Sequence, residues 1–197
     1  MSLRHLRPLI STDIGNTFLK QRGGYRNLIA YQKAECIYDV TFYFANKHLT
    51  KGDRTIDQMI QAARSGKQNI VEGCSASTTS RETEIKLINV AKASLQELLI
   101  DYEDYLRVRE LTLWESNDKR AIHTREVCKT NNDSAYYREI IKRCTDEMIA
   151  NIAITLIHQT DFLLERLLKN AKQEFVENGG IREEMSRARI FHRKNNQ

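Results

Sequence analysis

Apolar residues recur at steps of three and four along most of the chain, which is the period of an amphipathic α-helix. Four long stretches share this pattern, and we expect one helix in each of 25–47, 53–73, 80–114 and 134–176. Asp53, and Thr79 or Ser80, are suitable N-caps, because their side chains satisfy free N–H groups of a first helical turn. Four helices with mostly short connections predict an all-α fold, an antiparallel up-down four-helix bundle with a short C-terminal helix.

The stretches between and beyond the four long helices complete the predicted organisation. The polar segment 115–134 is rich in turn residues and predicts a loop that holds a short helix near 120–128. After Gly179–Gly180, an amphipathic segment over 181–191 predicts the C-terminal helix. We therefore expect three parts: a flexible or loosely packed N-terminal segment over 1–24, the bundle over 25–178 and a basic suffix over 179–197.

Composition supports long helices and a globular chain. One proline and eight glycines occur in 197 residues, and both residue types interrupt helices. The most apolar window, 148–164, contains Asn151, His158 and Asp161 and so predicts no membrane span. The four cysteines form no Cys-x-x-Cys pair, and no apolar run of signal-peptide length opens the chain. These features indicate reduced thiols and a cytoplasmic protein.

Charge is unevenly distributed along the chain, whose formal net charge is +5. Residues 1–33 hold six Lys and Arg against one Asp, residues 179–197 hold five against two Glu, and the middle is net acidic. Basic ends suit phosphate binding, and they also serve solubility alone. The candidate nucleic-acid-binding residues are Arg22, Arg26, Lys33, Arg64, Lys67, Arg182, Arg187, Arg189, Arg193 and Lys194.

No motif of an active site or a metal site is visible. The chain lacks Gly-x-Ser-x-Gly, His-Glu-x-x-His and the nucleotide-binding glycine patterns. Acidic residues recur along the third helix, but a di-metal bundle needs Glu-x-x-His pairs on facing helices, and none occurs. These observations predict a non-enzymatic protein without a cofactor or a metal.

Asn69, Glu72 and Gly73 form a polar motif at the end of the second helix. A half-buried amide and carboxylate at this position need partners. We favour a polar pair that fixes helix register or seals a subunit contact over a catalytic role. Gly66 lies inside the same helix, where glycine costs roughly 1 kcal/mol relative to alanine. It indicates a close helix approach or a bend, and simple tolerance of the glycine is the third interpretation.

The chain resembles the four-helix-bundle family of 23S ribosomal RNA intervening-sequence proteins over residues 25–110. The resemblance rests on one segment in each of the first three helices: Tyr25-x-x-Leu28 with Tyr31-Gln32-Lys33-Ala34; Gln58, Ala62-Ala63-Arg64-Ser65 and Asn69-Ile70-Val71-Glu72-Gly73; and Ile88-x-x-Ala91-x-Ala93-Ser94-Leu95-x-Glu97-Leu98. The segment 179–189 is similar to a suffix found in a longer bacterial subgroup. The chain departs from the family pattern at 49–53 and at 66–68.

This resemblance implies a bacterial, non-enzymatic bundle that assembles as a homopentamer. Some related proteins are accessory variability proteins of diversity-generating retroelements. They bind nucleic acid and a reverse transcriptase through a basic surface, so RNA or DNA and a reverse transcriptase are implied as partners. Aromatic residues beyond one stripe per helix, among them Tyr43, Phe44, Tyr136 and Tyr137, agree with self-assembly. A homo-oligomeric scaffold with no nucleic-acid role stays open, because the acidic middle would dilute a basic footprint.

Overall fold

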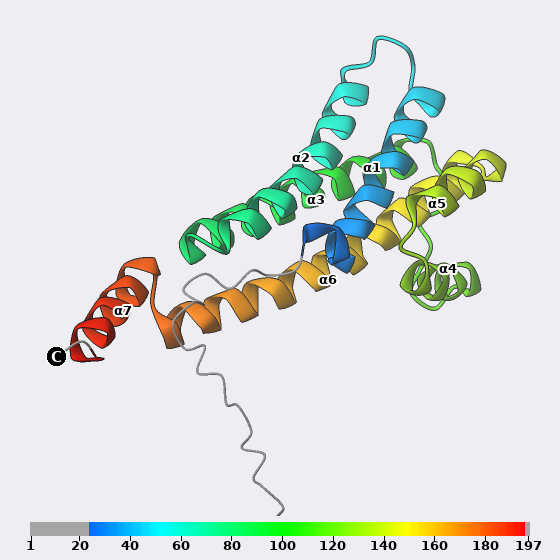
Figure 1. Ribbon diagram of the computed structural model, residues 1–197. Coiled ribbons are helices and arrows are strands. Elements are labelled where there is room, and N and C mark those ends of the chain that lie inside the picture. The colour runs from blue at the N-terminus through cyan, green and yellow to red at the C-terminus, as the bar shows by residue number, and fades with distance from the viewer. Residues whose placement is uncertain (1–23, 196–197) are drawn as a thin grey trace, which may run out of the picture.

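The computed structural model describes residues 24–195, and the regular elements in this range are all helical (Figure 1). The four long helices are α1 (Ile29–His48), α2 (Arg54–Ala76), α3 (Arg81–Val108) and α6 (Asp146–Asn178). The shorter ones are η1 (Tyr25–Asn27), α4 (Lys119–Thr130), α5 (Ser134–Ile140), η2 (Ile141–Arg143) and α7 (Ile181–Asn195). The all-α prediction is confirmed, whereas the predicted N-terminal segment lies outside the described residues except for Gly24.

The four long helices surround one core. α1 contacts α2 and α6, and α3 contacts the same two helices. Phe44, Met59, Leu95 and Leu156 are fully buried, and each comes from a different one of the four. Burying a large apolar side chain contributes about 1.5–3 kcal/mol, so this shared interior is the main source of stability. None of the helices in the described range combines the length and apolar character that a bilayer crossing requires.

α2 and α3 approach each other closely because α2 presents glycines to α3. A Cβ atom added at Gly66 would lie 2.8 Å from Cδ2 of Leu95, inside the normal contact distance. A Cβ atom at Gly73 would lie 3.3 Å from Cγ1 of Ile88. Of the three interpretations of Gly66 drawn from the sequence, the close helix approach agrees with the structure.

Two predicted helix ends are wrong. α2 continues past Gly73 to Ala76, because Gly73 is buried against α3 and does not adopt the left-handed conformation of a C-terminal glycine. α3 ends at Val108 and not near Trp114, since Glu110 takes a positive φ of 55°. The Leu111 N–H then donates to the Leu106 carbonyl at 2.9 Å, which closes the helix end.

The predicted fourth helix over 134–176 is interrupted. α5 and η2 cover its first part, the backbone becomes extended at Cys144, and α6 starts afresh at Asp146. Thr145 is the N-cap of α6, and its Oγ1 accepts a hydrogen bond from the Met148 N–H at 3.3 Å. The short helix predicted near 120–128 is confirmed as α4, and the C-terminal helix is confirmed as α7.

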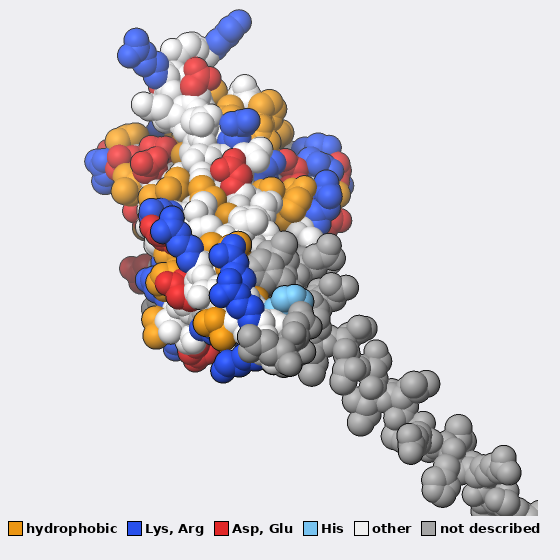
Figure 2. Space-filling view, turned by 60° about the vertical axis from the view of Figure 1, so that its left-hand side comes forward, with side chains coloured by type: hydrophobic (Ala, Val, Ile, Leu, Met, Phe, Trp, Pro, Cys, Tyr) orange, Lys and Arg blue, Asp and Glu red, His pale blue; other side chains and the backbone are white. Residues whose placement is uncertain are grey.

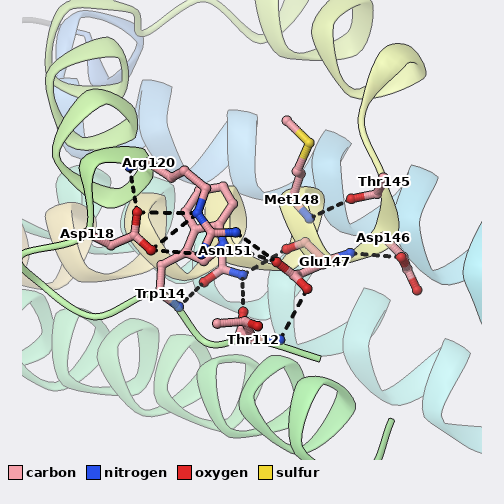
Figure 3. A network of polar contacts seen from close by, with 9 residues as sticks. All are labelled: Thr112, Trp114, Asp118, Arg120, Thr145, Asp146, Glu147, Met148 and Asn151. Atoms are coloured by element: carbon pink, nitrogen blue, oxygen red, sulfur yellow. Dashed lines mark hydrogen bonds and ion pairs between the residues drawn. The ribbon is translucent and has the colours of Figure 1, made fainter. Parts of the chain in front are cut away.

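A polar network fastens the segment after α3 to the first turns of α6 (Figure 3). Asn151 is 3% exposed; its Oδ1 accepts from the Trp114 N–H, and its Nδ2 donates to the Thr112 carbonyl, each at 2.9 Å. The Glu147 carboxylate accepts from the Trp114 indole N–H at 3.2 Å. Arg120 lies over the Trp114 ring and also pairs with Glu147. These contacts set the path by which the chain leaves α3 and enters α4.

Candidate nucleic-acid interface

The basic suffix folds as a separate helix because two glycines end α6. Gly179 has a φ of 72°, in the region that favours glycine, so the chain turns sharply after Asn178. The Gly180 N–H donates to the Glu183 carboxylate at 3.0 Å, which satisfies one free donor at the start of α7. The local sequence therefore specifies both the break and the new helix.

Charges along α7 are sorted by sign. Its two acidic residues, Glu183 and Glu184, lie in the first turn, and His192, Arg193 and Lys194 lie in the last. This order complements the helix macrodipole and supports the helix by itself. From Met185 onward the charged side chains of α7 are all basic. The second half of the helix thus presents cations with no carboxylate between them.

Three exposed arginines of α7, Arg182, Arg189 and Arg193, share one side of the helix, since seven and four residues separate them. At 1.5 Å per residue the row is about 16 Å long. One strand of duplex DNA carries a charge every 3.4 Å of axis, so the row spans about five phosphates. In Figure 2, Lys and Arg side chains lie over the whole of the visible face, several of them in its lower half, with Asp and Glu side chains between them.

A shallow hollow of about 330 Å³ lies beside this row. Its lining combines Met185, Ala188 and His192 with Arg189 and Arg193. A nucleotide base can stack on apolar and imidazole side chains, while neighbouring guanidinium groups contact its phosphate. The hollow and the arginine row thus place apolar and cationic surface side by side on α7.

The other predicted contacts are not on α7. Arg26 is exposed and stacks over the Tyr25 ring at 5.0 Å, and Arg64 is exposed on α2. Lys67 is half-buried one turn further along α2, with its Nζ 4.2 Å from the centroid of the Tyr38 ring. Five of the predicted residues therefore lie together on α7, namely Arg182, Arg187, Arg189, Arg193 and Lys194. Arg26 lies in η1, and Arg64 and Lys67 lie on α2. Arg22 lies outside the described residues.

The prediction is wrong for Lys33. This side chain is 3% exposed, and its Nζ donates to the Cys128 carbonyl in the last turn of α4. Burial lowers its pKa from the ordinary value of 10.5. Lys33 supplies positive charge to a helix C-terminus, where the macrodipole is negative, and it cannot reach a phosphate at the surface.

The motif of Asn69, Glu72 and Gly73 divides into separate structural roles. Asn69 Nδ2 donates to the Ser65 carbonyl at 2.9 Å and to Ser65 Oγ at 3.2 Å. Ser65 Oγ in turn lies 2.9 Å from Ser94 Oγ on α3, which links the two helices. Glu72 is exposed and does not complete a buried pair with Asn69. Asn69 thus agrees with the expected role in helix register, and Glu72 does not.

A second surface was missed by sequence reasoning. Tyr38, Phe42 and Tyr43 of α1 line a groove of about 620 Å³ against Ile141 of η2. The aromatic residues beyond the helical stripes were a partial signal, but Phe44 and Tyr137 proved to be buried within the protomer. Within the described range, no group of three or more His, Cys, Asp or Glu side chains is arranged to hold a metal ion.

Comparison with known proteins found no match: neither a family model, nor a curated protein, nor a solved structure is similar to this chain. The resemblance to intervening-sequence proteins therefore remains an expectation carried by the quoted segments.

Proposed function

We propose that this protein is a non-enzymatic, self-associating helical bundle that binds nucleic acid through α7. In this proposal the four long helices run up and down in alternation. The contacts of α1 and α3 with both α2 and α6 support that arrangement. So do the short connections 49–53 and 77–80, which suit antiparallel neighbours.

The observation that carries the nucleic-acid proposal is the exposed row of Arg182, Arg189 and Arg193. Guanidinium groups bind phosphate oxygens with two donors at once, and each neutralised phosphate releases condensed counterions. Because the contacts are to the backbone, we expect affinity without strong sequence preference. The hollow beside the row favours single strands, whose bases are free to leave the stack.

The test is a titration of labelled single-stranded RNA and duplex DNA at increasing salt. Three phosphate contacts predict a loss of affinity of about 20-fold for single strands and about 40-fold for duplex DNA between about 50 and 200 mM salt. The variant Arg182→Gln, Arg189→Gln, Arg193→Gln should lose most of this salt dependence together with the affinity.

A matched control separates α7 from net charge. Arg54, Lys119 and Lys129 are exposed and lie on α2 and α4. Replacing these three with glutamine removes the same charge, and the affinity should change little. Equal losses in the two triple variants would assign binding to overall charge, and absence of binding at low salt would remove the nucleic-acid role.

An oligomeric scaffold without nucleic acid is the second candidate. Large apolar side chains outside α7 are strongly exposed, among them Val108 at 61% and Ile100 at 56%. Such side chains favour contacts between copies of the chain. Light scattering that gives a multiple of the protomer mass, with no affinity for nucleic acid at low salt, would select this candidate.

A further inference from the structure

The groove between α1 and the α5–η2 segment has an apolar floor that no other part of the described chain fills. Tyr38, Phe42, Tyr43 and Ile141 line it, and Phe42 is 51% exposed. Two flat aromatic rings, Tyr38 and Phe42, lie with centroids 6.3 Å apart along α1. An exposed aromatic cluster of this kind is the usual centre of a protein–protein contact.

The rim of the groove carries an excess of positive charge. Its two carboxylates are already paired: Asp39 with Arg138 at 3.1 Å, and Glu139 with Lys142 at 2.8 Å. Lys47 is exposed on the rim, and Lys67 lies over the Tyr38 ring. Neither lysine has an ion-pair partner among the described residues. The occupant of the groove should therefore present apolar side chains together with carboxylates.

The outer side of α3 has this chemistry. Val90, Ile100 and Val108 are 46%, 56% and 61% exposed. Helical spacing places Glu97, Asp104 and Arg107 on the same side. Arg107 pairs with Asp104 at 2.7 Å, so this side keeps a net negative charge through Glu97. Burial and the neighbouring carboxylates of Asp104 and Glu97 raise the pKa of Asp101, which lies beside this stripe. A cation that approaches this carboxylate would stabilise its charged form.

We propose that the α3 stripe of one copy docks in the α1–α5 groove of a second copy. The proposal rests on the self-association in the proposed function and names the surfaces that would form it. The whole stripe from Val90 to Val108 is about 27 Å long, and its part from Glu97 to Val108, about 16 Å, matches the roughly 14 Å of α1 from Tyr38 to Lys47. Apolar side chains meet the aromatic floor, and acidic residues meet the basic rim.

The two surfaces lie on different helices, so the contact pairs unlike surfaces. α1 and α3 both contact α2 and α6, which separates the groove from the stripe within one protomer. One copy therefore uses its stripe while its own groove stays open to a third copy. A contact of this type generates a closed ring or an open filament, whereas a two-fold dimer pairs the same surface with itself.

The test uses two charge-reversed variants of the full chain. The first carries Lys47→Glu on the rim of the groove and Lys67→Glu over the Tyr38 ring that lines it, and the second carries Glu97→Lys and Asp104→Lys on the stripe. Each alone should weaken self-association by about 10-fold or more, as measured by sedimentation, since close charge pairs across an interface couple at that level. Mixing the two variants should restore association, because each then supplies the complement of the other.

Two further variants separate the groove from general effects. Lys119→Glu with Lys129→Glu reverses two exposed charges on α4, and the mass in solution should not change. Phe42→Ala should weaken association, whereas Phe162→Ala, a more exposed phenylalanine on α6, should not. Circular dichroism checks that every variant keeps its helices, so that a loss of association is not a loss of folding.

The outcomes distinguish the proposals. A monomeric wild-type chain would overturn both self-association and the assignment of its surfaces. A wild-type oligomer whose mass is indifferent to the groove and stripe variants would overturn this assignment alone. Failure of the mixed variants to associate would also overturn it. Shielding of the groove by polyglutamate in a chain that stays monomeric would do the same, since it would assign the groove to another acidic protein.

Discussion

At the scale of single residues, Lys33 of α1 is a buried cation whose hydrogen-bond partner comes from a distant segment of the chain. In the sequence it ends the basic segment 1–33, and a surface role is reasonable. In the fold, α4 and α5 lie beside this part of α1, and Lys33 Nζ donates to the Cys128 carbonyl. Tyr137 OH, from α5, donates to the Asn131 carbonyl at 3.0 Å in the same corner. The lysine is therefore a structural cation that terminates α4.

Lys33→Met should reveal the cost of this buried charge through its pH dependence. Burial lowers the pKa of Lys33 below 10.5, so the unfolded chain binds the proton more tightly than the folded one. The wild type should therefore gain stability, relative to the variant, as the pH rises from the lowered pKa towards 10.5. Denaturant unfolding of both proteins over this range measures the difference and cancels the titrations that they share.

Lys119→Met, at an exposed position on α4, is the control and should show no such trend. A difference between Lys33→Met and the wild type that stays constant with pH would contradict the buried-charge interpretation.

At the scale of single helices, glycine has two distinct uses in this chain. Gly179 ends α6 through its positive φ. Gly66 and Gly73 lie inside α2, have no positive φ, and allow close packing on α3. The residue type alone does not separate these uses, which is why α2 was expected to stop at Gly73. Burial of the position against a neighbouring helix separates them.

Alanine substitutions at the two glycines of α2 should therefore differ. At Gly66 the new methyl group meets both Cγ and Cδ2 of Leu95 below 3.0 Å, and Leu95 is fully buried. Overpacking costs typically 1–3 kcal/mol, which exceeds the helix-propensity gain of about 1 kcal/mol, so Gly66→Ala should lower the free energy of unfolding by about 1 kcal/mol.

Gly73→Ala meets Ile88 at 3.3 Å, and a small shift relieves that contact. The propensity gain then roughly offsets the strain, and stability should change by less than about 0.5 kcal/mol. Equal destabilisation of the two alanine variants in urea unfolding would argue against a specific close approach at Gly66.

At the scale of the whole molecule, a long connecting segment, called the excursion below, joins α3 to α6. Residues 109–145 leave the ring of four helices, form α4 and α5, and return. The buried side chains of Cys128, Tyr137 and Ile141 anchor this segment in the core. Polar contacts hold the rest: Asn151 and Glu147 bind its beginning, Gln159 Nε2 donates to the Arg125 carbonyl at 2.9 Å, and Lys33 binds the end of α4. We expect the excursion to open locally at a lower free energy than the core helices.

Asn151→Ala tests this expectation. The substitution leaves the Trp114 N–H and the Thr112 carbonyl without their partner, at a cost of about 1 kcal/mol each, so a destabilisation of about 2 kcal/mol is expected. Hydrogen exchange should accelerate in 109–145 more than in α2 and α3. Asn89→Ala removes a surface amide that donates only to its own helix, and it should be nearly neutral. Uniform acceleration across all helices would contradict a separate opening unit.

The sequence by itself determined the helical class, most of the helices and the sorted charges of the suffix. Periodicity, N-caps such as Asp53 and Ser80, and the glycine pair before α7 act within a few residues of themselves, so they can be recognised locally. The basic row on α7 follows from the same local geometry. These features do not depend on which other segments of the chain are near.

Only the tertiary structure decided which side chains are covered. The burial of Lys33, the groove beside Phe42, the exposed stripe of α3 and the interruption at Cys144–Thr145 all depend on where α4 and α5 pack. The exposed fraction of a side chain depends on contacts with segments that are distant in sequence. The residue type does not determine which of these segments packs against it. The same lysine can therefore bind a phosphate at the surface or terminate a helix in the interior, depending on which segment lies beside it.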